Sequence, residues 1–196
     1  FGKCFNFILR AMSCKIFVRK FSNSGPKFAN KYPVFLFQNP FEWISVKLDA
    51  KLLQNKWDKE FNIELFKEGS KQALAAVTQY IKKNDLNELT GLLTREALNK
   101  FKEEVSKWDS RAIEGLPLQT EDIQGIRIRK IDLQTIVEKR YCDIDVITVS
   151  IKEVQEALLL YDIRMRFHRE YSEGKLPEWT LTKFVLESFK RYDLTK

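Results

Sequence analysis

Apolar residues recur at helical spacing in two stretches of the first half of the chain. In residues 58–83 they return every three or four positions, which predicts a core-facing helix that begins at Asp58. Residues 95–108 repeat the pattern, with Thr94 as the predicted cap. The predicted stripes are Phe61, Leu65, Phe66, Gly69, Ala73, Ala76, Val77 and Tyr80 in the first helix, and Ala97, Phe101, Val105 and Trp108 in the second.

Two shorter helical segments complete this half. Residues 44–57 predict a short helix ahead of the first stripe, and residues 84–93 a helical turn capped by Asn84 or Asp85. Gly69 stands inside the first stripe, where glycine costs a helix roughly 1 kcal/mol relative to alanine. We therefore expect another element to approach the helix closely at Gly69.

Beyond Pro117 the spacing of apolar residues drops to two, which predicts strands at residues 125–133, 140–149, 161–171 and 178–192. The expected inward residues are Ile126 and Ile128 on the first strand, Cys142, Ile144 and Val146 on the second, and Ile163, Met165, Phe167 and Tyr171 on the third. Helices followed by half-polar strands predict an α+β fold. Its N-terminal helices should pack on one face of a four-stranded antiparallel sheet and leave the other face open.

Charge is distributed unevenly along the chain. Residues 1–41 carry basic residues and no Asp or Glu, so the whole net charge of +7 lies there. A basic, acid-free segment with serines and scattered apolar residues is typical of a mitochondrial transit peptide, and we predict one at residues 1–21. The alternative is a basic arm that binds nucleic acid or anionic lipid. Without this segment the chain is nearly neutral, which argues against nucleic-acid binding.

Residues 22–41 are predicted to form a linker, because Pro33 and Pro40 interrupt any helix through them. Its aromatic run, YPVFLFQNPFEW, is expected either to dock on the folded domain or to touch a membrane surface. The α+β domain is then predicted to span residues 42–196.

Residue types that build catalytic and metal sites are scarce. The chain has one histidine, His168, on the polar face of its strand, and it has neither a glycine-rich phosphate loop nor a Cys-x-x-Cys pair. Asp143 and Asp145 share a strand face, as a metal or acid–base pair could. Arginines on the same face of other strands favour a cross-strand charge ladder instead. We predict no catalytic residue, no metal site and no cofactor.

Two segments resemble a known family. The first is Trp57-Asp58-Lys59-Glu60-Phe61-Asn62-Ile63, followed by Phe66, Gly69, Lys71, Gln72, Ala73 and Val77. The second is Phe167-His168-Arg169-Glu170-Tyr171, followed by Gly174, Pro177, Trp179 and Thr180. Both are similar to the translocase-subunit-44-like superfamily of the mitochondrial import motor, and the resemblance extends in order over residues 58–190.

The resemblance implies a cystatin-like, cone-shaped domain in the mitochondrial matrix, peripheral to the inner membrane and without catalytic residues. It implies binding to subunits of the membrane-embedded m-AAA protease and help for newly imported inner-membrane proteins, notably the regulator of the calcium uniporter. The alternative within the superfamily is a protein of the mitochondrial large ribosomal subunit near the exit tunnel. A third class, a small-molecule lyase or isomerase, would need an acid or base where the pattern predicts apolar residues.

Four arginines are the predicted partner-binding residues. Strand alternation places Arg127, Arg129, Arg164 and Arg166 on the sheet face without helices. Arginine is enriched at protein interfaces. We expect these side chains to meet acidic groups of the protease or of its client; the alternative is a face that is only solvated.

Overall fold

The computed structural model describes residues 39–196, except 91, 92, 94, 156, 175–177, 195 and 196. The predicted transit peptide at residues 1–21, nearly all of the predicted linker, Cys4, Cys14 and the predicted cap Thr94 lie outside the described residues. Within the described part, no helix combines the length and the apolar character needed to cross a membrane.

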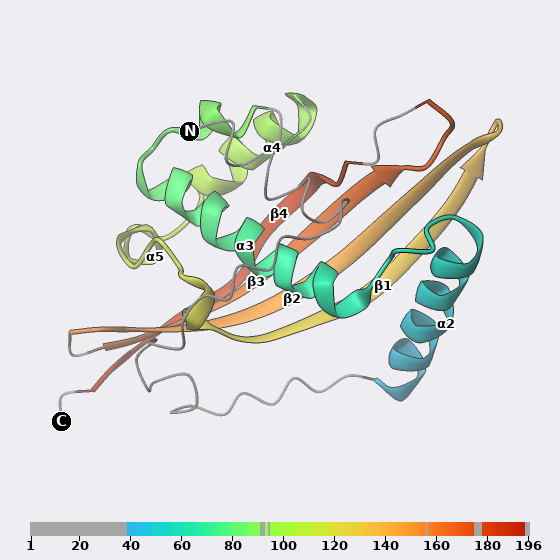
Figure 1. Cartoon of the computed structure of the whole chain (residues 1–196). Coiled ribbons are helices and arrows are strands. Elements are labelled where there is room, and N and C mark those ends of the chain that lie inside the picture. Colours follow the sequence, from blue (N-terminus) through green and yellow to red (C-terminus); the bar gives the residue numbers. More distant parts are fainter. Residues whose placement is uncertain (1–38, 91–92, 94, 156, 175–177, 195–196) are drawn as a thin grey trace, which may run out of the picture.

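The sheet is built from strands in simple sequence order. β1 (Ile123–Ile136), β2 (Lys139–Val154), β3 (Ala157–Glu170) and β4 (Thr180–Asp193) form one four-stranded sheet in the order β1-β2-β3-β4. All neighbours are antiparallel, and Figure 1 shows the long strands as one twisted layer. The ladders close tightly at Ile136↔Lys139 and at Val154↔Ala157, so two residues connect the strands at each of these hairpins.

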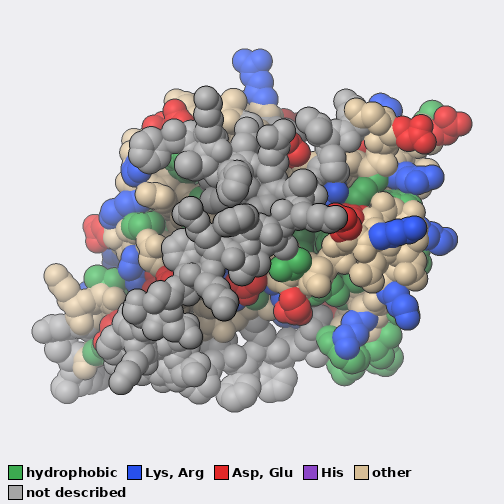
Figure 2. All heavy atoms as spheres, viewed as in Figure 1, with side chains coloured by type: hydrophobic (Ala, Val, Ile, Leu, Met, Phe, Trp, Pro, Cys, Tyr) green, Lys and Arg blue, Asp and Glu red, His purple; other side chains and the backbone are tan. Residues whose placement is uncertain are grey.

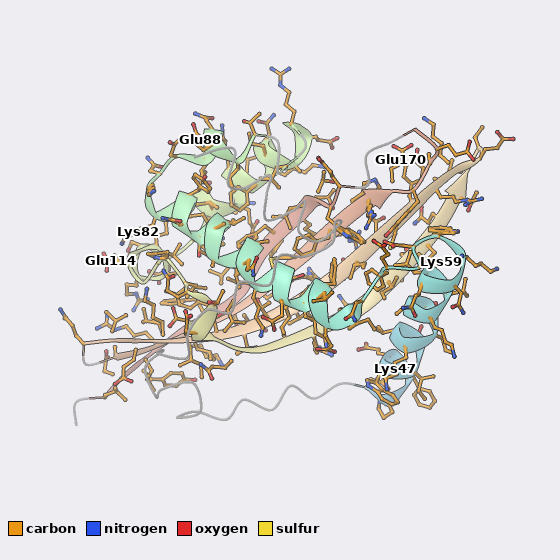
Figure 3. The ribbon with its side chains drawn as sticks, in the orientation of Figure 1. Lys47, Lys59, Lys82, Glu88, Glu114 and Glu170 are labelled. Carbon is orange, nitrogen blue, oxygen red and sulfur yellow. The ribbon has the colours of Figure 1, made fainter. Side chains whose placement is uncertain are left out.

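The helices cover one face of this sheet. α3 (Ile63–Lys82), α4 (Arg95–Ser106) and α5 (Ser110–Glu114) lie over it, whereas α2 (Pro40–Lys56) lies beside the edge strand β1 (Figure 1). Two 3₁₀ turns, η1 (Leu86–Leu89) and η2 (Thr120–Asp122), connect them. Lys82, labelled in Figure 3 near Glu114, donates to the carbonyl of Glu114 at 2.9 Å and ties α3 to α5. The predicted α+β fold is confirmed.

The core lies between the helices and the inward face of β2, β3 and β4. The predicted inward residues Cys142, Ile144, Val146, Ile163, Met165 and Phe167 are all fully buried. Phe66 of α3 meets Phe167 edge-on, with ring centroids 5.4 Å apart, and Phe101 of α4 meets Phe184 in the same way at 5.3 Å. The strand periodicity therefore predicted the buried face of β2 and β3 correctly.

The start of α3 differs from the prediction. The helix begins at Ile63 rather than at Asp58, because Asn62 is the cap: its side chain accepts hydrogen bonds from the backbone N–H groups of Glu64 and Leu65. The prediction had the right face at Phe66, Gly69, Ala73 and Val77, which are buried, but Leu65 is exposed. Leu74 and Ile81, outside the predicted stripe, are buried.

The helix before it is longer than predicted. α2 begins at Pro40, not at Ile44, and ends at Lys56. Asn39 caps it by accepting from the N–H of Phe41 at 3.0 Å. Proline is favoured in the first turn of a helix because its fixed φ suits the helix and its missing N–H is not needed there. Pro40, which was expected to interrupt a helix, starts this one.

An irregularity in β1 changes which residues face the core. The register shifts between Ile128 and Lys130, which is typical of a β-bulge. As a result Ile128 and Ile131, three positions apart, are both buried, while Ile126 is only partly covered. Ile126 and Ile128 both face the core, as predicted, but the alternation does not continue past Ile128.

Candidate functional site

The sheet face opposite α3 carries most of the predicted site residues. We name it the polar face; among its members are Asp143, Asp145, Arg164, Arg166 and His168, which alternate along β2 and β3 with the buried core residues. In the ladder, Asp143 lies directly opposite His168, and Asp145 directly opposite Arg166. The predicted charge ladder is therefore present between these two strands.

Arg166 and Asp145 form the tightest pair of the polar face. The guanidinium donates from Nε and Nη2 to both carboxylate oxygens of Asp145, the second bond being 2.8 Å long. Asp145 is buried, and this hydrogen bond raises the pKa of Arg166 above its usual range. A buried carboxylate needs such a partner, because an unpaired charge there would carry the full desolvation penalty.

The other three predicted arginines have different surroundings. Arg127 Nη1 lies 3.6 Å from Glu42 Oε2 of α2, and Arg164 Nη2 lies 2.6 Å from Glu187 Oε1 of β4. Arg129 stands at the register shift of β1, is exposed and forms no ion pair with any described residue. Three of the four arginines are thus neutralised within the chain, and the guanidinium of Arg129 is the most available one.

His168 belongs to the same ladder. Its Nδ1 lies 2.8 Å from Oδ1 of Asp143, and its ring stacks on Tyr141 with centroids 5.6 Å apart. The hydrogen bond to Asp143 raises the pKa of His168, and burial opposes this only in part. The pair therefore stabilises the protonated imidazole and is a structural ion pair at mildly acidic pH.

The described residues offer little for catalysis. No group of three His, Cys, Asp or Glu side chains among them could hold a metal ion. Cys142 is fully buried, and burial raises the pKa of its thiol, so the nucleophilic thiolate is disfavoured. What the polar face can do is present a rigid, charge-balanced surface.

A second cluster joins the two sequence segments that carry the family resemblance. We name it the junction cluster: Trp57, Asp58, Arg169, Tyr171 and Trp179. Asp58 Oδ2 lies 3.0 Å from Nη1 of Arg169 and accepts a hydrogen bond from the Tyr171 hydroxyl at 3.0 Å. The guanidinium of Arg169 also stacks 4.4 Å from the centre of the Tyr171 ring.

The junction cluster fixes the chain between α2 and α3 onto the sheet. Trp57 contacts Tyr171 at 5.9 Å between ring centroids, and Phe61 contacts Trp179 at 6.4 Å. Both partners of the ion pair, Asp58 and Arg169, are largely shielded from solvent. Arg169 lies in a segment that carries the resemblance but is not among the predicted site residues, although the period of two places it on the same face as Phe167.

α2 carries a second feature that was not predicted from the sequence. Its inner side buries Val46, Ala50 and Leu53, but its outer side is also apolar. Phe41 is 80% exposed and Leu48 61% exposed. The sequence could have revealed this apolar outer side, because its residues recur at every third or fourth position. We name it the outer stripe: Phe41, Ile44, Leu48 and Leu52.

Basic residues border the outer stripe. Lys47 and Lys51 directly precede Leu48 and Leu52, and Lys47 Nζ lies 3.9 Å from the centre of the half-exposed Trp43 ring. Figure 2 shows hydrophobic side chains with lysine or arginine beside them at the lower right, where α2 begins in Figure 1. Lys47 is labelled on this helix in Figure 3.

Comparison with known proteins adds two findings. The family described as Tim44-like domain matches residues 54–163, which include α3, α4, α5, β1, β2 and the first half of β3. No solved structure matches the chain significantly.

The curated relatives are mitochondrial proteins by name. The chain is 25% identical over 169 residues to "m-AAA protease-interacting protein 1, mitochondrial" of Rattus norvegicus, and 24% identical over 175 residues to the protein of that name from Homo sapiens. These alignments cover 75% and 78% of this chain, but only 58% and 60% of the relatives. The chain thus spans less than two-thirds of the proteins it matches.

Proposed function

Because the chain belongs to the Tim44-like domain family, we propose that it is a non-catalytic mitochondrial adaptor that binds the m-AAA protease. It would act in the matrix, next to the inner membrane, and help newly imported membrane proteins mature. Relatives that carry the name of the protease partner, aligned over three-quarters of this chain, support the proposal. Adaptor function requires a surface rather than a reactive group, and the charge-paired polar face suits that requirement.

One observation carries this proposal furthest. Asp58 belongs to one of the segments that resemble the family and Tyr171, 113 residues further along, to the other, yet the two segments meet in the junction cluster. The residues that carry the family resemblance are therefore neighbours in the folded chain.

The proposal is tested by affinity purification of the tagged full chain from isolated mitochondria, followed by mass spectrometry. Enrichment of m-AAA protease subunits over a tag-only control is the expected result. Enrichment of large-ribosomal-subunit proteins instead would favour the ribosomal alternative, and enrichment of neither would overturn the adaptor proposal.

We propose in addition that the outer stripe of α2 rests on the surface of an anionic membrane. Four exposed apolar side chains lie on one side of this helix, with Lys47 and Lys51 beside them, and such a side can enter the membrane interface. Trp43 suits the same place, since indole rings favour the headgroup region. The rest of the domain would then lie on the matrix side of this helix.

Flotation with vesicles of phosphatidylcholine and an anionic phospholipid tests the membrane contact. The full chain should float with these vesicles, and the double substitution Phe41→Gln/Leu48→Gln should reduce the bound fraction at least five-fold. Leu65→Gln is the matched control, because Leu65 is a half-exposed leucine on the neighbouring helix α3. Equal flotation of the double variant would sink the membrane proposal.

The polar face is proposed as a contact surface for the protease or its client. Reversing Arg166 would leave the buried Asp145 without its partner and damage the fold, so Arg129 is the better probe. Arg129→Glu should reduce capture of the protease in low salt. The control Arg95→Glu, on α4, should leave capture at the wild-type level. Wild-type capture by Arg129→Glu as well would mean that the polar face is only solvated.

A further inference from the structure

The hairpin between β1 and β2 projects from the body of the protein. Residues 134–140 are all exposed, and we name them the hairpin tip. Two apolar side chains stand at its apex: Ile136 is 54% exposed and Val137 is 89% exposed. In Figure 1 this hairpin ends at the upper right, and Figure 2 shows hydrophobic and acidic side chains at that corner.

The backbone of the apex is unfavourable for the residues it holds. Val137 has φ 47° and Glu138 has φ 67°, the left-handed geometry of a two-residue type I′ hairpin turn. Asn and Gly are the residues that such turns favour. A β-branched residue at positive φ is an outlier, because its branched Cβ crowds the backbone.

Neither the exposed apolar side chains of the tip nor the positive φ of Val137 helps the protein to fold. An Asn at position 137 would relieve the backbone and remove an exposed apolar group at the same time. The ladder that supports the apex is continuous from Ile131↔Ile144 to Ile136↔Lys139, so the two strands stay paired up to the turn. A strained, exposed and preorganised apolar apex is the arrangement expected of a contact residue.

We propose that Ile136 and Val137 insert into an apolar recess of a protein partner. This inference rests on the proposed adaptor function, which makes that partner a subunit of the m-AAA protease. Glu138, Lys139 and Arg140 surround the apex with charges of both signs. The recess therefore has a polar rim that offers both an acidic and a basic group.

A protein recess fits the tip better than a lipid surface does. Glu138 stands next to Val137 at the apex and offsets one of the two positive charges of Lys139 and Arg140, so an anionic headgroup layer would attract the tip only weakly. Two apolar side chains are also a small area for partition into lipid, whereas a pocket can enclose them completely. The outer stripe of α2, with four exposed apolar side chains, is the larger apolar surface.

The test compares two matched substitutions in the full chain, Val137→Asn in the tip and Gln155→Asn in the hairpin between β2 and β3. Gln155 also has positive φ, at 46°, but lies at the other end of β2. Val137→Asn should raise Tm by about 2–4 °C and lower capture of m-AAA protease subunits at least five-fold. Gln155→Asn should leave capture at the wild-type value.

A rise in Tm together with loss of capture separates a contact role from a structural one, because a damaged fold would lower both. Wild-type capture by Val137→Asn overturns the inference and leaves the adaptor proposal standing. If the wild-type chain captures no protease subunit, both proposals fall. An unchanged or lower Tm of Val137→Asn overturns the argument from strain.

A second measurement identifies what the apex touches. Photoreactive p-benzoylphenylalanine placed at position 137 should cross-link to a protease subunit in mitochondria. Cross-linking to lipid alone, or to no protein, overturns the proposed protein recess. The same group at position 155 is the control and should give no protease product.

Discussion

Single residues of β2 determine the charge pattern of the polar face. Asp143 and Asp145 each face a cation on β3 directly across the ladder, His168 and Arg166. Neither carboxylate is therefore free to share a metal ion or a proton with the other. Such paired charges fit the composition of the chain, which beyond residue 41 has equal numbers of acidic and basic residues.

The pair of His168 and Asp143 makes a prediction about pH. Because Asp143 raises the pKa of His168 in the folded state, the pair stabilises the fold fully below the unfolded histidine pKa of about 6.5. This contribution is lost as the pH rises through the higher folded pKa. The Tm difference between wild type and His168→Gln should therefore be larger at pH 6 than at pH 8.5.

His168 is the one histidine of the chain, so its imidazole signal in an NMR titration is unambiguous. The titration midpoint should lie above that of a histidine in a short peptide, and Asp143→Asn should lower it. A midpoint that Asp143→Asn does not move would contradict the ion pair.

At the scale of elements, α3 shows how a helix start is chosen. Asp58, Asn62 and the apolar pattern all offer possible starts, and local propensity does not separate them. Asp58 does not cap the helix, because its carboxylate binds Arg169 and Tyr171 on the sheet, 111 and 113 residues further along. Asn62 is left to cap the helix.

Gly69 makes the second prediction. It is buried in α3, on the side that carries Phe66 and Ala73. Gly69→Leu should overpack this face and lower the free energy of unfolding by about 1–3 kcal/mol, which thermal or urea denaturation would measure. Leu65→Ala, at an exposed position of the same helix, is the control and should change stability little. An unaltered stability of Gly69→Leu would show that the helix tolerates bulk there.

At the scale of the whole molecule, the junction cluster connects three surfaces that are candidates for contacts. It ties the segment after α2 to the end of β3, and so sets the position of the outer stripe relative to the polar face and the hairpin tip. The proposed membrane contact of α2 and the proposed protein contact of the tip would then be made by surfaces in a fixed relation to each other.

A double-mutant cycle tests that connection. Asp58→Ala and Arg169→Met should each cost about 3 kcal/mol, because each leaves a charge with little solvent around it unpaired. The double variant should cost less than the sum of the two by about 1 kcal/mol or more. Additive effects would mean that the two side chains act independently and that the cluster is held by its aromatic rings alone.

The pattern of apolar positions was sufficient to predict the α+β class, the four strands and the buried faces of β2 and β3. It worked there because side chains alternate strictly in an unbroken ladder, and burial of one face selects the register. The same rule failed in β1, where the bulge near Arg129 breaks the alternation. A bulge has no dependable signature in a stretch such as GIRIRKIDL.

The sequence by itself determined the fold class, the residue types available for chemistry and the family to which the chain belongs. Only the tertiary structure decided which arginines are free, which side of α2 is buried and where the apolar apex of the β1–β2 hairpin stands. These depend on partners distant in the chain, such as Glu42 for Arg127 and Glu187 for Arg164. Local spacing cannot report such partners, since the contact exists only after the sheet has formed and the helices have packed against it.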